Sequence, residues 1–351
     1  MSDASPRGVH ARPAVVTLLL LAALTARASE PEASLPVVPP VPTAPASAAS
    51  PDADTEYVIR TTFDRIGRIA APVEINGRVF RFVLDTGANR SAVSAATAEA
   101  LGLVPVDGDV MHVHGVTGSA TLPVVQVASF RAGDLLFENK AMPVLPSAVF
   151  AGMDGILGVD CLQDARVEVD FGRDRVTIRR SSGRRAPSGY LVVPAWLQHG
   201  GLLLVNGQVG RVPVKAILDT GAERSLGNEA LRAALAARAR RPQESVNSTV
   251  IGATPQLAQG QSIEAPAIDI GGARLNNLTV TFGDLHVFNI WSLLEEPALL
   301  IGMDLLGTLE RFVVDYPRHE FHLKPVSSRY PGVRHCGGSP ECASRIPRPD
   351  T

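Results

Sequence analysis

Two stretches of the chain are nearly identical. They are Phe82-Val83-Leu84-Asp85-Thr86-Gly87-Ala88-Asn89-Arg90-Ser91 and Ala216-Ile217-Leu218-Asp219-Thr220-Gly221-Ala222-Glu223-Arg224-Ser225. Seven of the ten positions agree, and the second copy lies 134 residues after the first. Each copy sets Asp-Thr-Gly directly after a short apolar run of the kind that forms a buried strand. One short motif is weak evidence, whereas two copies at matching places in a repeat are strong evidence of a shared role.

The similarity continues on both sides of these stretches. Upstream, Ile75-Asn76-Gly77 resembles Val205-Asn206-Gly207, and Asn-Gly between apolar runs predicts the turn of a β-hairpin. Downstream, residues 156–162 match 300–306 and residues 170–173 match 315–318, in unchanged order. The repeat therefore predicts two homologous lobes, at about 57–183 and 184–325, which meet at a polar linker near 181–188.

Short runs of alternating or β-branched residues dominate both lobes and predict an all-β fold with strongly curved sheets. These runs lie at 79–84, 124–130, 166–170, 175–178, 212–218, 278–282 and 311–315. Helix is expected only at 95–101, at 228–240, and in short turns after Gly158 and Gly302. The arginines of 228–241 are expected to form a solvated helix face.

The composition is that of a globular protein that does not bind nucleic acid. Hydrophobic residues make up 45% of the 351, and 33 basic against 35 acidic residues leave a net charge of -2. Such a balance argues against disorder and against binding that depends on neutralising phosphates. The three cysteines are too few for a disulfide scaffold. Cys161 is expected to be buried, and Cys336 and Cys342 to close a small loop, the alternative being two free thiols.

Residues 1–28 have the pattern of a secretory signal peptide. Arg7 and Arg12 precede an apolar run of 11 residues, and Ala26-Arg27-Ala28 supplies a small-residue cleavage site. This run is too short to span a membrane, so we expect a secreted or periplasmic protein with no stable membrane span. An uncleaved anchor is the alternative. Residues 29–56 read as a Pro/Ala/Ser-rich tether, or less readily as a propeptide, and 326–351 as a tail.

Two aspartates that meet between homologous lobes can carry hydrolytic chemistry. A buried ionised carboxylate is costly, but two close carboxylates can share one proton. In such a pair the ionised partner takes a proton from a water, and the protonated partner donates to a carbonyl oxygen of the substrate. Asp85 and Asp219 are therefore the candidate catalytic residues.

The residues around each aspartate have expected supporting roles. Glycine permits a tight turn and a close approach to the carboxylates, the threonine hydroxyls can bond backbone across the axis, and the serines backbone within each loop. The later glycines let a returning strand pass close to the aspartate loop. These neighbours are Thr86, Gly87, Ala88, Ser91 and Gly158 in the first lobe, and Thr220, Gly221, Ala222, Ser225 and Gly302 in the second. Asp160 and Asp304 are expected to be N-caps of the short helices that follow.

These motifs resemble those of the aspartic peptidases, which are the well-known example of a proton-sharing carboxylate pair. Gly-x-Asp-x-Leu after each returning strand is closer to the retropepsin-like branch than to pepsin. The resemblance covers residues 57–324 and implies the acid-protease fold, with two pseudo-twofold-related β lobes and an active-site cleft between them. It also implies endopeptidase activity on extended peptides, catalysed by Asp85 and Asp219, in a monomer. No cofactor or metal is implied, since His112 and His114 have no third ligand in sight.

The candidate flaps depart from the pepsin pattern. They centre on Gly115, Val116 and Thr117 in the first lobe, and on Gly252, Ala253 and Thr254 in the second, and neither contains a tyrosine. Asp-Thr-Gly is followed by alanine in both lobes, where pepsin-like enzymes tend to have a hydroxyl. Without a hydroxyl to stabilise the ionised pair, we expect an optimum at weakly acidic or neutral pH.

Three readings of function remain open on the sequence. The first is an endopeptidase that cuts extended or unfolded polypeptides at apolar residues, with Val83 and Ile217 either lining its pockets or lying in the core. The second is a catalytically silent peptide-binding module of the same fold. The third is a homodimer that pairs lobes between chains, which two complete lobes in one chain make unnecessary.

Overall fold

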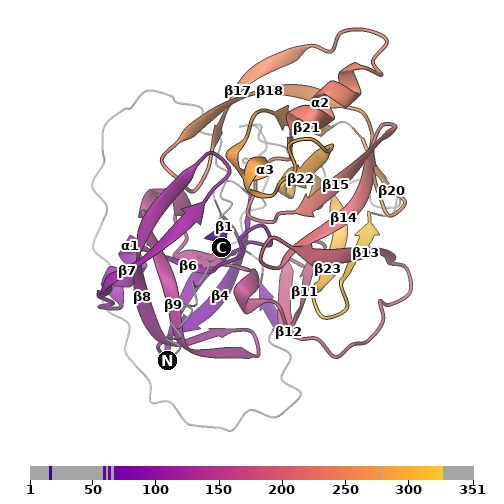
Figure 1. Cartoon of the computed structure of the whole chain (residues 1–351). Helices are drawn as coiled ribbons and strands as arrows, with labels where there is room; N and C mark the ends of the chain where they lie inside the picture. Colours follow the sequence, from indigo (N-terminus) through magenta and orange to yellow (C-terminus); the bar gives the residue numbers. More distant parts are fainter. Residues whose placement is uncertain (1–15, 18–57, 61, 65–66, 277, 327–351) are drawn as a thin grey trace, which may run out of the picture.

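The computed structural model describes residues 16–17, 58–60, 62–64, 67–276 and 278–326 (Figure 1). Most of the expected signal peptide, the tether, nearly all of the tail and the Cys336–Cys342 pair lie outside these residues. Within 1–28, β1 (Val16–Thr17) lies parallel to Val113 and His114. No helix of the described part is long and apolar enough to cross a membrane.

Six strands of the first lobe close into a barrel. Around the ring they follow the order β8, β9, β6, β10, β5 and β4, and pairing of β4 with β8 closes it. Their bounds are β4 (Ile69–Ile75), β5 (Arg78–Leu84), β6 (Ala92–Ser94), β8 (Ser119–Ala132), β9 (Leu135–Leu145) and β10 (Gly155–Leu157). Outside the ring, β7 (Pro105–His114) forms a long hairpin with β8, and β3 (Thr62–Phe63) pairs with β4. Closure turns apolar side chains such as Phe82 and Phe130 inward, where both are fully buried.

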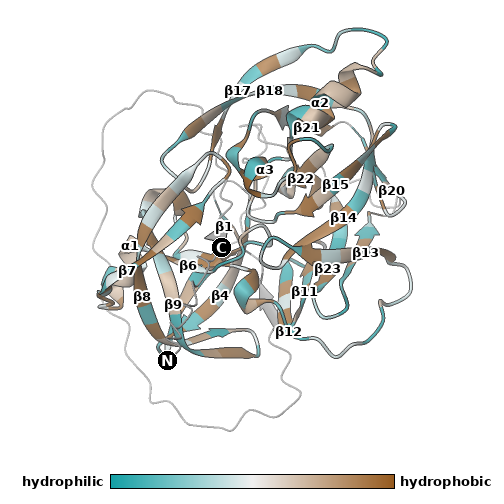
Figure 2. Cartoon of the chain, in the orientation of Figure 1, coloured by the Kyte–Doolittle hydropathy of each residue, from teal (hydrophilic) through white to brown (hydrophobic). Residues whose placement is uncertain are grey.

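The second lobe repeats these elements within a larger sheet. Its order is β17, β18, β21, β16, β22, β15 and β14, with β19 and β20 attached through β14. The bounds are β14 (Leu202–Val209), β15 (Val212–Leu218), β16 (Leu226–Gly227), β17 (Ser245–Ile251), β18 (Leu257–Ala265), β19 (Ile268–Ile270), β20 (Ala273–Leu275), β21 (Leu278–Phe282) and β22 (Ala298–Ile301). Figure 2 shows β15 and β22 as mostly hydrophobic, and β22 is buried at all four residues, as expected of a strand that is covered on both faces.

The two halves of the chain share one sheet. It continues from β14 through β13 (Leu191–Gln198), β24 (Glu320–Pro325) and β23 (Leu309–Asp315) to β11 (Ala165–Asp170), β12 (Arg175–Arg180) and β2 (Val58–Arg60). Strands β11 and β23 pair directly, and the buried guanidinium of Arg166 contacts Asp315 at 2.9 Å across this seam. The lobes are therefore joined by main-chain hydrogen bonds as well as by the linker.

The internal repeat is visible in the strand pairing. Strand β10 runs parallel to β5, with Leu157 beside Leu84, and β22 runs parallel to β15, with Ile301 beside Leu218. In both lobes the strand that carries Asp-Thr-Gly is thus held by the returning strand that ends in glycine. The predicted two-lobed all-β architecture is confirmed.

One expected hairpin turn was wrong. Asn76-Gly77 forms the turn between β4 and β5, with positive φ at both residues. Its counterpart in the second lobe is Gly210-Arg211, because Val209 pairs with Val212. Asn206-Gly207 lies inside β14, and an added Cβ at Gly207 would lie 2.5 Å from Ile270 Cδ1 of β19. That glycine serves the close approach of a neighbouring strand and no turn.

The helices are short, as expected. They are α1 (Ala95–Ala100), α2 (Glu229–Ala236), α3 (His286–Ile290), α4 (Met303–Leu306) and the 3₁₀ turns η1 (Ser147–Phe150) and η2 (Val159–Cys161). The second ends four residues before the expected position, because Leu235 is its last buried residue and residues 236–241 are exposed. The third was not anticipated, since five residues are too few to show a periodic pattern.

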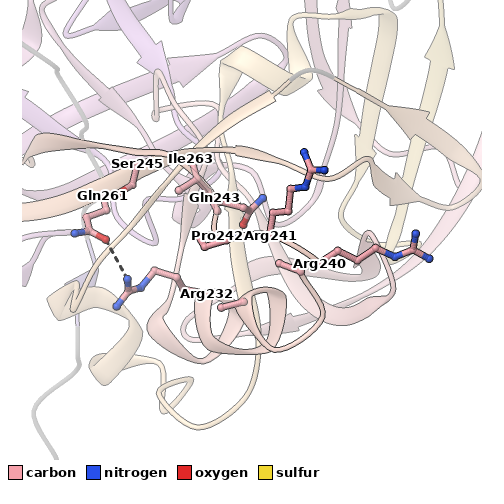
Figure 3. Close-up of a pocket in the computed structure, with 10 residues that line it drawn as sticks. Arg232, Arg240, Arg241, Pro242, Gln243, Ser245, Gln261 and Ile263 are labelled. Carbon is pink, nitrogen blue, oxygen red and sulfur yellow. Dashed lines mark hydrogen bonds between the residues drawn. The ribbon is translucent and has the colours of Figure 1, made fainter.

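A surface cavity of about 460 Å³ lies between the end of α2 and the β17–β18 hairpin (Figure 3). Arg232 Nη1 donates to Gln261 Oε1 at 3.0 Å, while Arg240 and Arg241 point away from that bond. Of the four arginines expected on a solvated helix face, Arg232 alone lies in α2 and is partly exposed, and the other three follow the helix and are exposed. This cavity is not lined by either Asp-Thr-Gly segment.

Candidate active site

Asp85 and Asp219 occupy equivalent positions at the ends of β5 and β15. The Asp85 N–H donates to Leu157 O at 3.0 Å, and the Asp219 N–H donates to Ile301 O at 2.9 Å. Each aspartate is thus fixed by the strand that returns beneath it. Both are fully buried. The shared geometry follows from the repeat, because in each lobe the hydrogen bonds of the parallel strand pair extend by one residue to include the aspartate.

The two carboxylates have matching environments. One oxygen of each accepts a backbone N–H, from Gly87 to Asp85 Oδ1 and from Gly221 to Asp219 Oδ1, both at 2.9 Å. The Oδ2 atoms of both aspartates are buried and have no partner within the described residues. A pair of carboxylate oxygens left without protein donors in a buried site is suited to share a proton and to bind a reacting group.

Glycine is required beside each carboxylate by its partner from the other lobe. A Cβ added to Gly87 would lie 2.3 Å from Asp219 Cγ, and one added to Gly221 would lie 2.2 Å from Asp85 Oδ2. No side chain fits at such distances. The Asp-Thr-Gly loop of each lobe therefore packs against the aspartate of the other.

Burial raises the pKa of both aspartates well above the ordinary value of 3.8. For Asp85 the negative charge of Asp219 adds to this rise, whereas the positive charge of Arg68 opposes it. For Asp219 the N–H bonds from Gly221 and Ala222, together with Arg68, lower the pKa but do not offset burial. Because both pKa values are raised, the pair keeps its shared proton to higher pH. This is the direction of the expected activity optimum at weakly acidic or neutral pH.

The threonines form the cross-lobe contacts that the sequence suggested. Thr86 Oγ1 donates to Leu218 O at 2.7 Å and accepts the Thr220 N–H at 3.1 Å. Thr220 Oγ1 donates to Leu84 O at 2.6 Å and accepts the Thr86 N–H at 3.1 Å. The four bonds tie the two aspartate loops together.

The serines and later glycines connect each loop to the returning strand. Ser225 Oγ donates to Asp304 Oδ1 at 2.7 Å and accepts the Gly302 N–H at 3.1 Å. In the first lobe Ser91 makes the same contacts with Asp160 and Gly158, at 2.7 and 3.0 Å. The serine hydroxyls therefore bridge to another segment, where bonds within the loop were expected. A Cβ on either glycine would lie 2.6 Å from the loop backbone, which confirms the predicted close approach.

Asp160 and Asp304 do not cap the helices that follow. The N-cap positions are Gly158 and Gly302, and both aspartates lie in the first turn. Their carboxylates accept from the serine side chains and backbone instead, at 2.7–2.9 Å. Burial raises the pKa of Asp304. These two carboxylates therefore hold the serine of each aspartate loop against the returning segment.

The alanines after Asp-Thr-Gly are buried at the same two junctions. The Ala222 N–H donates to Asp219 Oδ1 at 3.1 Å. The carbonyl oxygens of Ala88 and Ala222 accept the N–H groups of Val159 and Met303, both at 2.8 Å. The backbone of these residues, more than their methyl groups, therefore supports the aspartate loops.

The candidate flap residues lie at the tips of two hairpins that meet each other. Gly115, Val116 and Thr117 lie in the turn between β7 and β8, and Gly252, Ala253 and Thr254 follow β17. Thr117 Oγ1 lies 3.3 Å from Thr254 Oγ1, and Gln256 Nε2 donates to Ser119 O at 3.0 Å. The tips also lie against the lobes, since Ala253 packs in one apolar cluster with Val83 and Ala88.

The hairpins close the site. With both aspartates fully buried and the tips in contact, the expected cleft is shut in this structure. A substrate that lies between the lobes would therefore require the hairpin tips to separate. The sequence did not reveal this closure, because it depends on contacts between residues more than a hundred positions apart.

Two further groups near the site carry no motif. Arg68, before β4, is fully buried and its charge acts on both aspartates. His286 of α3 contacts His114 on the first flap, with Nε2 and Nδ1 3.2 Å apart, and α3 also bonds the flap tip through Val287 N–H and Val116 O at 3.3 Å. A lone arginine at the start of an apolar strand was the only available signal for Arg68.

The comparison with known protein families agrees with this geometry. The sequence model of the aspartyl protease family matches residues 71–161 and 204–305, which is just over half of the chain. The two matched regions each contain one Asp-Thr-Gly segment, its returning strand and its flap tip. No curated protein matches the sequence significantly. Two matched regions with this arrangement place the chain in the aspartyl protease family.

Proposed function

We propose that the protein is an aspartic endopeptidase that uses Asp85 and Asp219 as one catalytic pair. The observation that carries this proposal is the buried, symmetric pair whose Oδ2 atoms lack partners within the described residues. Burial keeps one proton on the pair, so that one carboxyl donates while the other accepts. Retropepsin-like flaps with glycine at the tip, rather than a tyrosine flap, favour that branch of the family.

In the proposed reaction a water lies between the carboxyls and the scissile carbonyl. The ionised aspartate takes a proton from the water, whose oxygen bonds to the carbonyl carbon. The protonated aspartate gives its proton to the carbonyl oxygen, which yields a gem-diol with no covalent bond to the enzyme. Proton transfer to the amide nitrogen then breaks the C–N bond and releases an amine and a carboxylic acid. The backbone N–H groups of Gly87 and Gly221 hold both carboxylates in position throughout.

The proposed substrates are extended or unfolded polypeptides with apolar residues at the cleavage site. Two flaps must close around the substrate, which favours an extended chain. The buried residues beside Asp85 are apolar, among them Val83, Ala88 and Ile156. Ile217 is part of the main core, so pocket lining is proposed for Val83 alone.

One chain supplies both halves of the site, so we propose a monomer. Secretion or a periplasmic location is also proposed, and it rests on the pattern of residues 1–28. N-terminal sequencing of the exported protein would test this location, because a mature chain that begins at Ser29 is expected.

The test is cleavage of an unstructured peptide library between pH 3 and 8 by the wild type and by Asp85→Asn and Asp219→Asn. Each substitution is expected to abolish turnover while the circular dichroism spectrum stays that of the wild type. Asp134→Asn, an exposed carboxylate at the β8–β9 turn, is the matched control and should retain activity. If the wild type binds peptides but cleaves none across this range, the protein is the peptide-binding module instead.

A further inference from the structure

Arg68 carries a buried guanidinium with unused donors. It is fully buried at the start of β4. Its Nε donates to Asp64 Oδ2 at 2.5 Å, and Nη2 donates to Phe150 O at 3.2 Å. Nη1 is buried and has no hydrogen-bond partner within the described residues. An arginine held in a fixed geometry by two partners, with its third nitrogen free, is an unusual and costly arrangement in a folded interior.

The strand register sets Arg68 beside the aspartate pair. Strands β4 and β5 are antiparallel with Ala70 opposite Val83. Extended by two residues, to the residue before β4 and the residue after β5, this register sets Arg68 opposite Asp85. The positive charge of Arg68 acts on both aspartates, which agrees with a short separation.

Apolar residues from the flap and the lobe adjoin the same place. Phe150, whose carbonyl accepts from Arg68, packs in one cluster with Val83, Ala88 and the flap residue Ala253. Arg68 is thus bonded to a residue of the apolar cluster that also contains Ala253 of the second flap. Movement of that flap would take Ala253 out of the cluster and uncover its remaining members.

The second lobe has no equivalent charge at the matching described position. There Leu204 lies opposite Ile217, two residues before Asp219, and the position that corresponds to Arg68 is Leu202. Leu202 is fully buried. At these matched positions the two sides of the site therefore differ in charge, with a guanidinium in the first lobe and an aliphatic side chain in the second.

We infer that Arg68 Nη1 binds a carboxylate of the substrate, in a subsite next to the aspartates on the side of the first lobe. The carboxylate is either a Glu or Asp side chain near the scissile bond or the free C-terminus of a short peptide. A guanidinium matches a carboxylate in shape and charge, and such bonds are stronger in a buried site. This inference rests on the proposed endopeptidase function and adds one acidic position to its apolar preference.

The experiment compares matched peptides. Fluorogenic peptides with an apolar pair at the centre carry Glu or Gln at each of four positions on either side, and are cleaved by the full chain at pH 6. At one position the Glu peptide should be cleaved with a kcat/KM roughly 10- to 100-fold above that of the Gln peptide, as expected for a charge-assisted bond. A second set ends near the centre as a free acid or as an amide, which separates a terminal carboxylate from a side chain.

Variants assign the preference to Arg68. Arg68→Gln should bring the ratio of kcat/KM for the Glu and Gln peptides, measured within that variant at one pH, close to 1, and Arg68→Lys should keep part of the preference. Arg166→Gln is the matched control, because it also removes a buried guanidinium bonded to an aspartate but lies in the sheet between β11 and β23. It should retain the full preference for Glu.

Several results would overturn the inference. The first is equal cleavage of the Glu and Gln peptides by the wild type at every position, found together with equal cleavage of the acid and amide sets. The inference also fails if Arg68→Gln retains the preference for Glu. It fails too if Arg68→Gln only shifts the pH profile of all peptides alike, because Arg68 would then act on the pKa of the aspartates and not on the substrate.

The measurement remains decisive if Arg68→Gln does not fold, because the wild-type preference alone can refute the subsite. Binding of the same peptides to Asp85→Asn, followed by fluorescence anisotropy, separates the two proposals. A Glu-over-Gln affinity ratio without wild-type turnover would support the subsite and refute the endopeptidase. Turnover without any carboxylate preference would do the reverse.

Discussion

Thr86 and Thr220 each hold the main chain of the other lobe. Each hydroxyl accepts the other threonine's N–H at 3.1 Å and donates to a carbonyl in the strand that carries the other aspartate, at 2.7 and 2.6 Å. All of these groups are buried. The position of Asp85 relative to Asp219 thus depends on bonds made by the threonine that follows each aspartate.

Replacing Thr220 by valine should damage both stability and activity. The substitution keeps the shape but leaves the Thr86 N–H and the Leu84 carbonyl without their partner. Buried groups that lose a partner cost about 1–3 kcal/mol each, so the free energy of unfolding should fall by about 2–6 kcal/mol. Denaturant unfolding measures this change. Thr220→Ser keeps the hydroxyl and should lose much less; if the two variants are equally stable, the cross-lobe bonds do not have the role described.

Replacing Gly221 by alanine should reduce catalysis through the opposite lobe. The new methyl group would lie 2.2 Å from Asp85 Oδ2, so the carboxylate has to move. A displacement of about 1 Å can lower the rate about 100-fold. Peptide cleavage should show that loss in kcat/KM for Gly221→Ala. Gly172→Ala is the control, because its Cβ would meet its nearest atom at 3.5 Å; similar kinetics in both variants would contradict the packing of Gly221 on Asp85.

The sequence was sufficient for the repeat, the aspartate loops and the flap tips, because each is a local pattern that occurs twice. It was misleading where a distant segment decides the outcome. Asn206-Gly207 has the local signal of a turn, but β19 pairs with that stretch and keeps it extended. Asp160 and Asp304 have the local signal of N-caps, but they lie in the first turns of the short helices, and serines from another segment donate to them. Arg68 has no motif, and its importance depends on burial and register, which only the folded chain provides.

Asp219→Asn should stabilise the protein at neutral pH. The pKa of Asp219 is raised in the folded chain, mainly by burial, so the native state binds more protons than the unfolded state above about pH 3.9. The contribution of protonated Asp219 to the stability of the wild type is therefore fully present below that pH. It is lost as pH rises through the pKa of Asp219 in the folded chain. Asparagine does not ionise and avoids this loss.

Calorimetry across pH provides the measurement for this substitution. The difference in Tm between Asp219→Asn and the wild type should be small at pH 3 and positive at pH 7. A gain of about 1 kcal/mol would move Tm by roughly 2–4 °C for a chain of this size. Asp134→Asn, on the surface, should show no such trend. A Tm difference that is largest at pH 3 would mean that the pKa of Asp219 is lowered by folding.

The contact of His114 with His286 should make closure of the first flap sensitive to pH. Ser119 Oγ lies 2.7 Å from His114 Nδ1 and 2.9 Å from His286 Nε2, and the imidazoles are stacked. Burial, His286 and His112 lower the pKa of His114. The closed flap therefore binds fewer protons than an open one, and its stability is lost as pH falls below the ordinary histidine pKa of about 6.5.

Hydrogen exchange of the β7–β8 hairpin tests this closure. After correction for intrinsic rates, amides near the flap tip should exchange faster at pH 5.5 than at pH 7.5. In His286→Phe an aromatic ring remains but the imidazole that faces His114 is gone, so the pH dependence should be weaker. His112→Phe removes an exposed histidine of the same hairpin, bonded to Thr121, and should keep most of it. If His286→Phe exchanges with the same pH dependence as the wild type, the contact between the two histidines does not control the flap.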